Sequence, residues 1–228
     1  MKDLTRSTGS GLRLRNSDSR RSILSKTEGL KLEGGDALVV VAHPDDETIW
    51  MGGTILAHLG VRWTVYALCK RSDPDRAPKF PHAMRVLHAH GIITDFADDD
   101  DRVSVKELSR KAEKLITKAL SKKSFDYIFT HASDGEYGNL RHKGVHRAVR
   151  NLLQSKKLRA TKSYCFAYQM APHDKFAIPK KKADFEIKLP KSIFNEKVRI
   201  IKDIYGFQPK SFEYLSCIKV ESFNALVL

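Results

Sequence analysis

The 228-residue chain is about one and a half times the length of a typical domain of ~150 residues, so one domain with an appended segment fits better than two complete domains. Its content of apolar residues (41%) and charged residues (30%) excludes a wholly disordered chain, and no apolar run approaches the ~18 residues of a membrane helix. The net charge of +14 favours contact with anions, but the aromatic-and-basic patterns of nucleic-acid-binding modules are missing, so no specific nucleic acid is expected as a partner.

Residues 1–35 are rich in Ser, Arg, Gly and Thr and lack an apolar period, which predicts a flexible basic arm ahead of one domain over residues 36–228. In that domain, apolar runs typical of buried strands alternate with helical patterns. The expected strands are Ala37–Ala42, Trp63–Cys69, Ile92–Phe96, Phe125–Thr130 and Ser163–Met170. The expected helices are Thr48–Leu59, Pro81–His90 (ended by Gly91), Val105–Leu120, His142–Leu153 and Ser192–Tyr205. The alternation predicts the α/β class: a single-domain, Rossmann-like, mostly parallel sheet flanked by helices.

Directly after the first strand comes the motif H-P-D-D-E at residues 43–47. Functional groups of parallel sheets gather beyond the carboxyl ends of the strands, and three crowded carboxylates are unfavourable unless a cation or hydrogen bonds offset them. His43 and Asp46 can reach one metal if the chain turns sharply, which leaves Asp45 beside the metal. The alternative is a helix cap at Asp45 or Asp46, with His43 as an incidental polar residue. A second histidine cluster downstream favours the metal.

That second cluster follows the strand Phe125–Thr130. It consists of His131, Asp134, Glu136, Tyr137, His142 and His146. His142 and His146 are four residues apart at the start of a helix, so they share a face, and in such a pair one residue is more often a ligand and the other a neighbour. One histidine from each of two strand ends plus one aspartate makes a three-ligand zinc site with an open position, which is the catalytic type.

The motif A-H-P-D-D-E after a buried strand, followed by G-E-Y-G-x-x-x-H-x-x-V-H, resembles the PIG-L/LmbE-like family of zinc-dependent N-acetylglucosaminyl deacetylases. The resemblance spans roughly Ala37 to Val149, with a looser similarity to about Gln208. It implies that the protein binds a cofactor, Zn²⁺ or another divalent metal, and that its active-site residues correspond to those of the family. The implied metal ligands are His43, Asp46 and His142; the implied catalytic and substrate-binding residues are Asp45 as general base, Tyr137 near the oxyanion, and Arg76 on the substrate.

Two positions depart from the pattern of the family. Asn139 stands where the family usually has a histidine that assists the tetrahedral intermediate or the leaving group. An asparagine can donate a hydrogen bond to an oxyanion, and Asn139 is therefore kept among the catalytic candidates, but it cannot act as a general acid. Either Asp45 performs both proton transfers, or His131 or His146 substitutes, or activity is reduced. The second departure is Lys79, where the family commonly has a glutamate.

These expectations describe a zinc-dependent hydrolase that removes an acetyl group from an N-acetylated sugar, either a GlcNAc-type glycan or a sugar conjugate. Two alternatives stay open: a catalytically weakened protein that binds metal and sugar, and an amide hydrolase for another small N-acyl substrate. The loop Lys70–Pro81 and the segment Pro172–Pro190 are expected at the entrance, where their lysines would favour a phosphorylated or nucleotide-linked sugar. Three widely spaced cysteines indicate a reduced, cytoplasmic protein. No membrane span is expected, and assembly into a homo-oligomer stays open.

Overall fold

The sheet is built around the apolar run that follows the predicted arm. In the computed structural model, which describes residues 28–96, 102–172 and 175–228, the strand β2 (Asp36–Val41) is buried from its second residue onward. It pairs in parallel with β3 (Arg62–Ala67) on one side and with β5 (Ser124–Thr130) on the other. Because both edges and both faces of β2 are covered, its sequence is continuously apolar rather than alternating.

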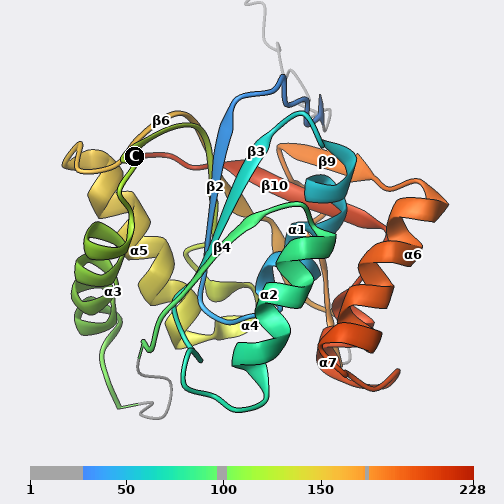
Figure 1. Cartoon of the computed structure of the whole chain (residues 1–228). Helices are drawn as coiled ribbons and strands as arrows, with labels where there is room; N and C mark the ends of the chain where they lie inside the picture. Colours follow the sequence, from blue (N-terminus) through green and yellow to red (C-terminus); the bar gives the residue numbers. More distant parts are fainter. Residues whose placement is uncertain (1–27, 97–101, 173–174) are drawn as a thin grey trace, which may run out of the picture.

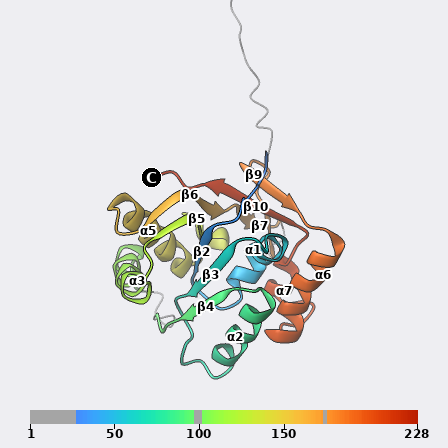
Figure 2. The same cartoon turned by 45° about the horizontal axis from the view of Figure 1, so that its top comes forward.

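Among the described residues, eight strands form one sheet in the order β1-β9-β10-β6-β5-β2-β3-β4 (Figures 1 and 2). The other members are β1 (Glu28–Gly29), β4 (His90–Ile93), β6 (Arg159–Phe166), β9 (Phe185–Lys188) and β10 (Val220–Ala225). Pairing is parallel from β4 to β6, whereas β10 is antiparallel to both β6 and β9. The strands β7 (Tyr168–Met170) and β8 (Ala177–Pro179) form a separate hairpin. The predicted α/β fold with a mostly parallel sheet is confirmed.

Helices cover both faces of the sheet (Figure 1). One face carries α3 (Val105–Ala119) and α5 (Leu140–Gln154), which pack with Leu38 and Val40 of β2. The other face packs with Val39 and Val41, and it carries α1 (Asp46–Ala57), α2 (Arg76–Val86), α6 (Lys191–Arg199), the π-helical turn η1 (Ile200–Ile204) and α7 (Phe212–Ser216). The one-turn α4 (Gly135–Gly138) precedes α5. Within the ranges described, no helix has the length and apolar character that crossing a bilayer requires.

The predicted helix Pro81–His90 is misplaced. The helix begins five residues earlier because Asp73 Oδ1 accepts hydrogen bonds from the backbone N–H groups of Asp75 and Arg76, at 2.9 Å each. Gly91 does not end a helix but lies in β4, where an added Cβ would come within 2.6 Å of Met84 and 2.9 Å of Phe80. The glycine is therefore required for close packing of α2 against the sheet.

Other boundaries also differ from the predictions. The expected strand Ser163–Met170 is divided into β6 and β7, and the expected helix Ser192–Tyr205 changes from α-helical to π-helical at Ile200. The packed body begins before residue 36, because β1 pairs with β9 and Leu30 is buried in the core. Residues 1–27 of the predicted arm lie outside the described residues.

The helix α1, which carries the predicted metal ligand Asp46, is broken at Met51, whose φ of −150° and ψ of 15° are not helical. The carboxylate of Glu221 from β10 caps the second half of the helix by accepting from the N–H groups of Gly53 and Thr54, at 2.8 Å and 2.6 Å. Lys197 of α6 pairs with the same carboxylate at 2.7 Å, and both charged side chains are fully buried. This ion pair therefore joins α1, α6 and β10 beneath the site.

Replacing Lys197 with methionine is expected to destabilise the protein by about 3–5 kcal/mol, because it leaves the Glu221 carboxylate buried without its counter-charge. The measurement is chemical denaturation followed by circular dichroism. Lys202→Met, at an exposed lysine of η1, is the matched control and is expected to change the free energy of unfolding by less than about 0.5 kcal/mol. A loss below about 1 kcal/mol for Lys197→Met would contradict the role given to the pair.

Candidate metal centre and active site

Three side chains predicted as metal ligands converge at the carboxyl ends of the strands. His43 follows β2, Asp46 begins α1, and His142 lies in the first turn of α5; one ligand atom from each lies within 4.8 Å of the others. Asp46 Oδ2 is 3.3 Å from His43 Nδ1 and 3.4 Å from His142 Nε2. Two imidazoles and one carboxylate are a donor set that zinc and similar divalent metals bind.

The buried nitrogen of His142 tests whether these residues fit a metal. His142 Nδ1 donates to Glu136 Oε2 at 2.6 Å, so Nε2 carries the lone pair. That Nε2 atom is buried and has no hydrogen-bond partner among the described residues. Burial by itself would raise the pKa of Asp46, whereas His142 and His131, when protonated, hold it well below its usual value; a bound metal would supply that positive charge with His142 neutral. An unpartnered imidazole lone pair beside a carboxylate fits a bound cation.

Glu136 holds the histidines from behind. Its Oε2 accepts from His142 Nδ1 and from His131 Nδ1, at 2.6 Å and 3.0 Å, and its Oε1 accepts from the Ala132 N–H at 2.6 Å. The backbone of Glu136 has a φ of +59°, an uncommon conformation for a residue other than glycine. No role is predicted for Glu136 from the sequence, although its place in the motif G-E-Y-G, between His131 and His142, was a signal for one.

Glu136→Gln is expected to lower the zinc affinity 10–100-fold, the usual effect of losing a group that orients a ligand histidine. A glutamine has one acceptor oxygen in place of two and cannot receive both imidazole N–H groups and the Ala132 N–H. Competition with a chromophoric chelator measures the affinity. Glu113→Gln, at the α3–α5 contact with Asn151, is the matched control, and its zinc affinity is expected to equal that of the wild type. Equal affinities for all three proteins would remove the orienting role from Glu136.

Asp46 is fixed on both oxygens by α1 and its surroundings. Oδ2 accepts from the His43 N–H at 2.8 Å, and Oδ1 accepts from the indole of Trp50 at 3.0 Å. The carbonyl of Trp50 in turn accepts from the hydroxyl of Tyr168 at 2.9 Å. No role is predicted for Trp50 or Tyr168 from the sequence. The position of the tryptophan one helical turn after Asp46 was a signal, whereas the contact with Tyr168 depends on the tertiary fold.

Asp45 is buried next to Asp46 but lies outside the ligand group. Its backbone has a φ of 120°, and its carboxylate forms an ion pair with Arg76, whose guanidinium also donates to the Pro44 carbonyl at 3.2 Å. Burial and the neighbouring Asp46 raise the pKa of Asp45 well above its usual value, although Arg76 opposes this. The guanidinium carbon lies 4.4 Å from the ring centroid of Phe207. Arg76 therefore contacts Asp45 directly, and its role on substrate stays a prediction.

Glu47 of the H-P-D-D-E motif and Lys79, the second departure from the pattern of the family, are engaged in the scaffold. Glu47 Oε1 accepts from the hydroxyls of Thr48 and Tyr205 at 2.6 Å and 2.8 Å. Lys79 Nζ donates to the Tyr205 carbonyl at 2.8 Å and to Asp75 Oδ1 at 2.5 Å. Both residues thereby hold the end of η1 against the site.

His131 and His146 lie beside and behind the ligands. The ring of His131 stacks on that of His142 with centroids 3.7 Å apart, and its Nε2 accepts from the Ala42 N–H at 2.9 Å. His146 Nδ1 donates to the His131 carbonyl at 2.8 Å. Of the two histidines that share the face of α5, His142 belongs to the candidate ligand group with Asp46 and His43, and His146 does not.

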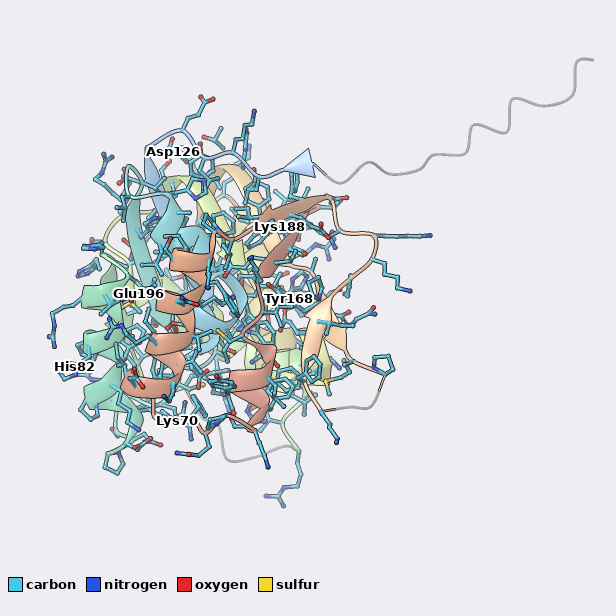
Figure 3. The ribbon with its side chains drawn as sticks, turned by 90° about the vertical axis from the view of Figure 1, so that its right-hand side faces the viewer. Lys70, His82, Asp126, Tyr168, Lys188 and Glu196 are labelled. Carbon is cyan, nitrogen blue, oxygen red and sulfur yellow. The ribbon has the colours of Figure 1, made fainter. Side chains whose placement is uncertain are left out.

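A pocket of about 210 Å³ opens on this group. Its lining consists of His43, Pro44, Asp45, Asp46, Ile49, Trp50, Lys70, Asp73, Arg76, Tyr137, Phe212 and Glu213. Figure 3 places Lys70 at the opposite end of the molecule from Asp126, the third residue of β5, so the pocket lies at the carboxyl ends of the strands. Larger hollows of about 730 Å³ and 840 Å³ lie along α3 and near β1, away from these side chains.

The lining differs from the predicted entrance. Lys70, Asp73 and Arg76 come from the expected loop, but no described residue of the segment 172–190 lines the pocket. Phe212 and Glu213 of α7 take that place. The ring of Tyr137 packs edge-on against Phe212 with centroids 4.7 Å apart. Asn139 is the N-cap residue of α5 and is not among the lining residues.

Residues 38–153 match the family model PIG-L, described as GlcNAc-PI de-N-acetylase. This segment is just over half of the chain and contains His43, Asp46 and His142. The chain belongs to the PIG-L family. The resemblance drawn from the sequence motifs is thereby confirmed at the level of the family.

Similar proteins are found by two further comparisons, one with protein sequences and one with solved structures. An uncharacterized protein of Acanthamoeba polyphaga mimivirus is 26% identical over 132 residues, which are 50% of this chain and 56% of that protein. The chain thus aligns with only about half of this relative. Among solved structures, the 4-carboxy-2-hydroxymuconate hydratase from Pseudomonas putida has 16% identity and a TM-score of 0.60, covering 85% of this chain and 96% of its own. N,N'-diacetylchitobiose deacetylase from Pyrococcus horikoshii has 17% identity and a TM-score of 0.57, covering 84% and 83%. At these identities the likeness shows the fold alone.

Proposed function

We propose that this PIG-L family protein is a zinc-dependent hydrolase that removes the acetyl group from an N-acetylated sugar of the hexosamine type. One observation carries the proposal: His43, Asp46 and His142 come together at a pocket that also contains Asp45, and the buried Nε2 of His142 lacks a hydrogen-bond partner among the described residues. The family description, GlcNAc-PI de-N-acetylase, and the deacetylase from Pyrococcus horikoshii, which is named for an N-acetylated disaccharide, support the same reaction class.

Six residues of the site have defined roles in this reaction. A divalent metal held by His43, Asp46 and His142 would lower the pKa of a bound water and polarise the acyl carbonyl. Asp45, held by Arg76, takes a proton from the attacking water, whose oxygen bonds to the acetyl carbon. The hydroxyl of Tyr137 donates to the developing oxyanion. Asp45 then gives its proton to the departing nitrogen as the C–N bond breaks, so the products are acetate and a free amino sugar.

The size of the pocket supports a small acylated group. A volume of about 210 Å³ corresponds to about seven water molecules at ~30 Å³ each. One sugar ring with its acetamido group is the largest unit of a glycan that such a volume suits. The remainder of a glycan or conjugate would therefore extend outside the pocket.

The charges of the lining balance when a divalent metal is counted with them. Four carboxylates, those of Asp45, Asp46, Asp73 and Glu213, line the pocket with the two cations Lys70 and Arg76, and Arg76 is already paired with Asp45. A divalent metal at His43, Asp46 and His142 would offset the two carboxylates that are in excess. The lining therefore gives no charge preference between a neutral sugar and a sugar that carries a phosphate outside the pocket.

The test compares metal-free protein with protein reloaded with Zn²⁺, using N-acetylglucosamine, N,N'-diacetylchitobiose, UDP-N-acetylglucosamine and an N-acetyl amino acid as substrates. Acetate and free amine are expected in equal amounts, from at least one of the three N-acetylated sugars, and only in the metal-loaded protein. Zinc binding without release from any of the four compounds would contradict the proposal and favour the binding-only alternative. Acetate release from the N-acetyl amino acid alone would instead identify the protein as an amide hydrolase for another small N-acyl substrate.

A further inference from the structure

Both ends of the Asn139 side chain are engaged. Its Oδ1 accepts from the N–H groups of Arg141 and His142, at 2.8 Å and 3.2 Å, and so caps α5. Its Nδ2 donates to the hydroxyl oxygen of Tyr137 at 3.2 Å. The two backbone donors require an acceptor, which fixes the orientation of the amide, so the nitrogen must face the tyrosine. One N–H of Nδ2 is thus given to Tyr137, and Asn139 itself is not among the residues that line the pocket.

The contact determines which way the Tyr137 hydroxyl points its proton. A phenol hydroxyl has one proton to donate and accepts through its lone pairs. Because Asn139 Nδ2 can only donate, Tyr137 is the acceptor in this hydrogen bond, and its own proton stays available. No acceptor for that proton is found in the described parts of the chain, and Tyr137 lines the pocket beside His43 and Asp46. The proton is thus available to an oxygen of a bound molecule.

We propose that Asn139 is a positioning residue with two separable actions: Oδ1 anchors the backbone of the metal ligand His142, and Nδ2 directs the proton of Tyr137 to the acyl oxygen of the substrate. The inference rests on the proposed function. The asparagine then does not donate to the oxyanion itself; it makes Tyr137 the oxyanion donor. This separates it from a simple helix cap, whose loss would lower stability and leave the proton of Tyr137 unaffected.

Two substitutions keep the cap and remove the amide donor. Asparagine, aspartate and serine are all good N-cap residues, but N139D has no donor, and the hydroxyl in N139S lies one bond closer to the backbone than the amide nitrogen that reaches Tyr137. In N139D the new carboxylate only accepts, so the proton of Tyr137 turns away from the pocket. Both variants are expected to keep the melting temperature of the wild type and a zinc affinity within threefold of it. Both are expected to lose at least tenfold in kcat, as Y137F does. N139A, which lacks both actions, is expected to lose zinc affinity as well.

A double-mutant cycle shows whether the two residues act through one hydrogen bond. On the Y137F background, N139D is expected to change kcat by less than about twofold, because the hydroxyl that it redirects is already absent. Asn195→Asp, an exposed asparagine on α6, controls for the added charge and is expected to leave kcat unchanged. Independent, multiplying effects of N139D and Y137F would overturn the proposal.

A binding measurement separates this inference from the deacetylase function. Acetohydroxamate presents an acyl oxygen to the metal-loaded protein without being turned over, and its affinity, measured by calorimetry, is expected to fall at least fivefold in Y137F, N139D and N139S. Unchanged affinity in N139D and N139S, with a lowered melting temperature in N139A, would reduce Asn139 to a helix cap. If the wild type releases no acetate from any sugar, the proposed function fails, while the acetohydroxamate affinities still decide the role of Asn139.

Discussion

Asp45→Asn is expected to lower kcat by roughly 10²–10⁴-fold, the usual contribution of a positioned acid or base, while the metal stays bound. The amide keeps the shape of the side chain but cannot take a proton from water. The fold tolerates the change because the backbone of residue 45 has a φ of 120°, and asparagine and aspartate are the residues other than glycine that adopt positive φ most readily. The measurement is acetate release at saturating sugar, with metal content determined on the same sample.

A matched control distinguishes loss of the base from loss of a charge. Asp203→Asn removes an exposed carboxylate on η1, outside the pocket, and is expected to leave kcat unchanged. Full activity of Asp45→Asn would contradict the assignment, because another group would then accept the proton. Loss of metal from Asp45→Asn would equally contradict it, since Asp45 lies outside the proposed ligand group.

His142→Ala is expected to abolish stoichiometric metal binding. The substitution removes one of three ligands and also a hydrogen-bond partner of Glu136, so the loss of zinc affinity is expected to exceed the 10–100-fold that a supporting group contributes. Elemental analysis after dialysis against a weak chelator measures the metal per chain. Circular dichroism confirms that the variant is folded, because the residual pairing of Glu136 with His131 keeps that carboxylate partnered.

His146→Ala is the matched control for His142→Ala. His146 lies four residues further along α5 and bonds the backbone carbonyl of His131 instead of facing Asp46. Its removal is expected to leave one metal per chain. Equal metal content in the His142 and His146 variants would contradict the ligand set. Metal loss from His146→Ala alone would show that His146, and not His142, binds the metal.

The parts of the fold that local sequence determines were predicted well. The run Ala37–Ala42 is continuously apolar because β2 is covered on both faces, and α3 begins at Val105 as predicted, after Ser104, whose side chain accepts from the Glu107 N–H. By contrast, β10 and α7 were not predicted. The residues of β10 are mixed polar and apolar, and the strand exists because β6 and β9 pair with it on either side. Long-range pairing of this kind leaves no local period to detect.

The residues of the candidate site also fall into two groups, those that a motif predicts and those that depend on the tertiary fold. The ligand group was predicted from its motifs, and the structure brings His43, Asp46 and His142 together, although their metal-binding role stays a proposal. Phe212 of α7 was missed because it reaches the pocket only through the packing of the C-terminal segment. The two hydrogen bonds from the histidines to Glu136 were also missed, because they depend on the positive φ of Glu136, which no sequence pattern predicts.

The most direct test of the central claim is anomalous diffraction at the zinc absorption edge from crystals of the zinc-loaded protein. One strong peak is expected among the side chains of His43, Asp46 and His142, with Nε2 of His142 turned to the metal and Nδ1 turned to Glu136. The absence of a peak at these residues, or a peak at other side chains, would contradict the claim that this PIG-L family protein holds its metal there.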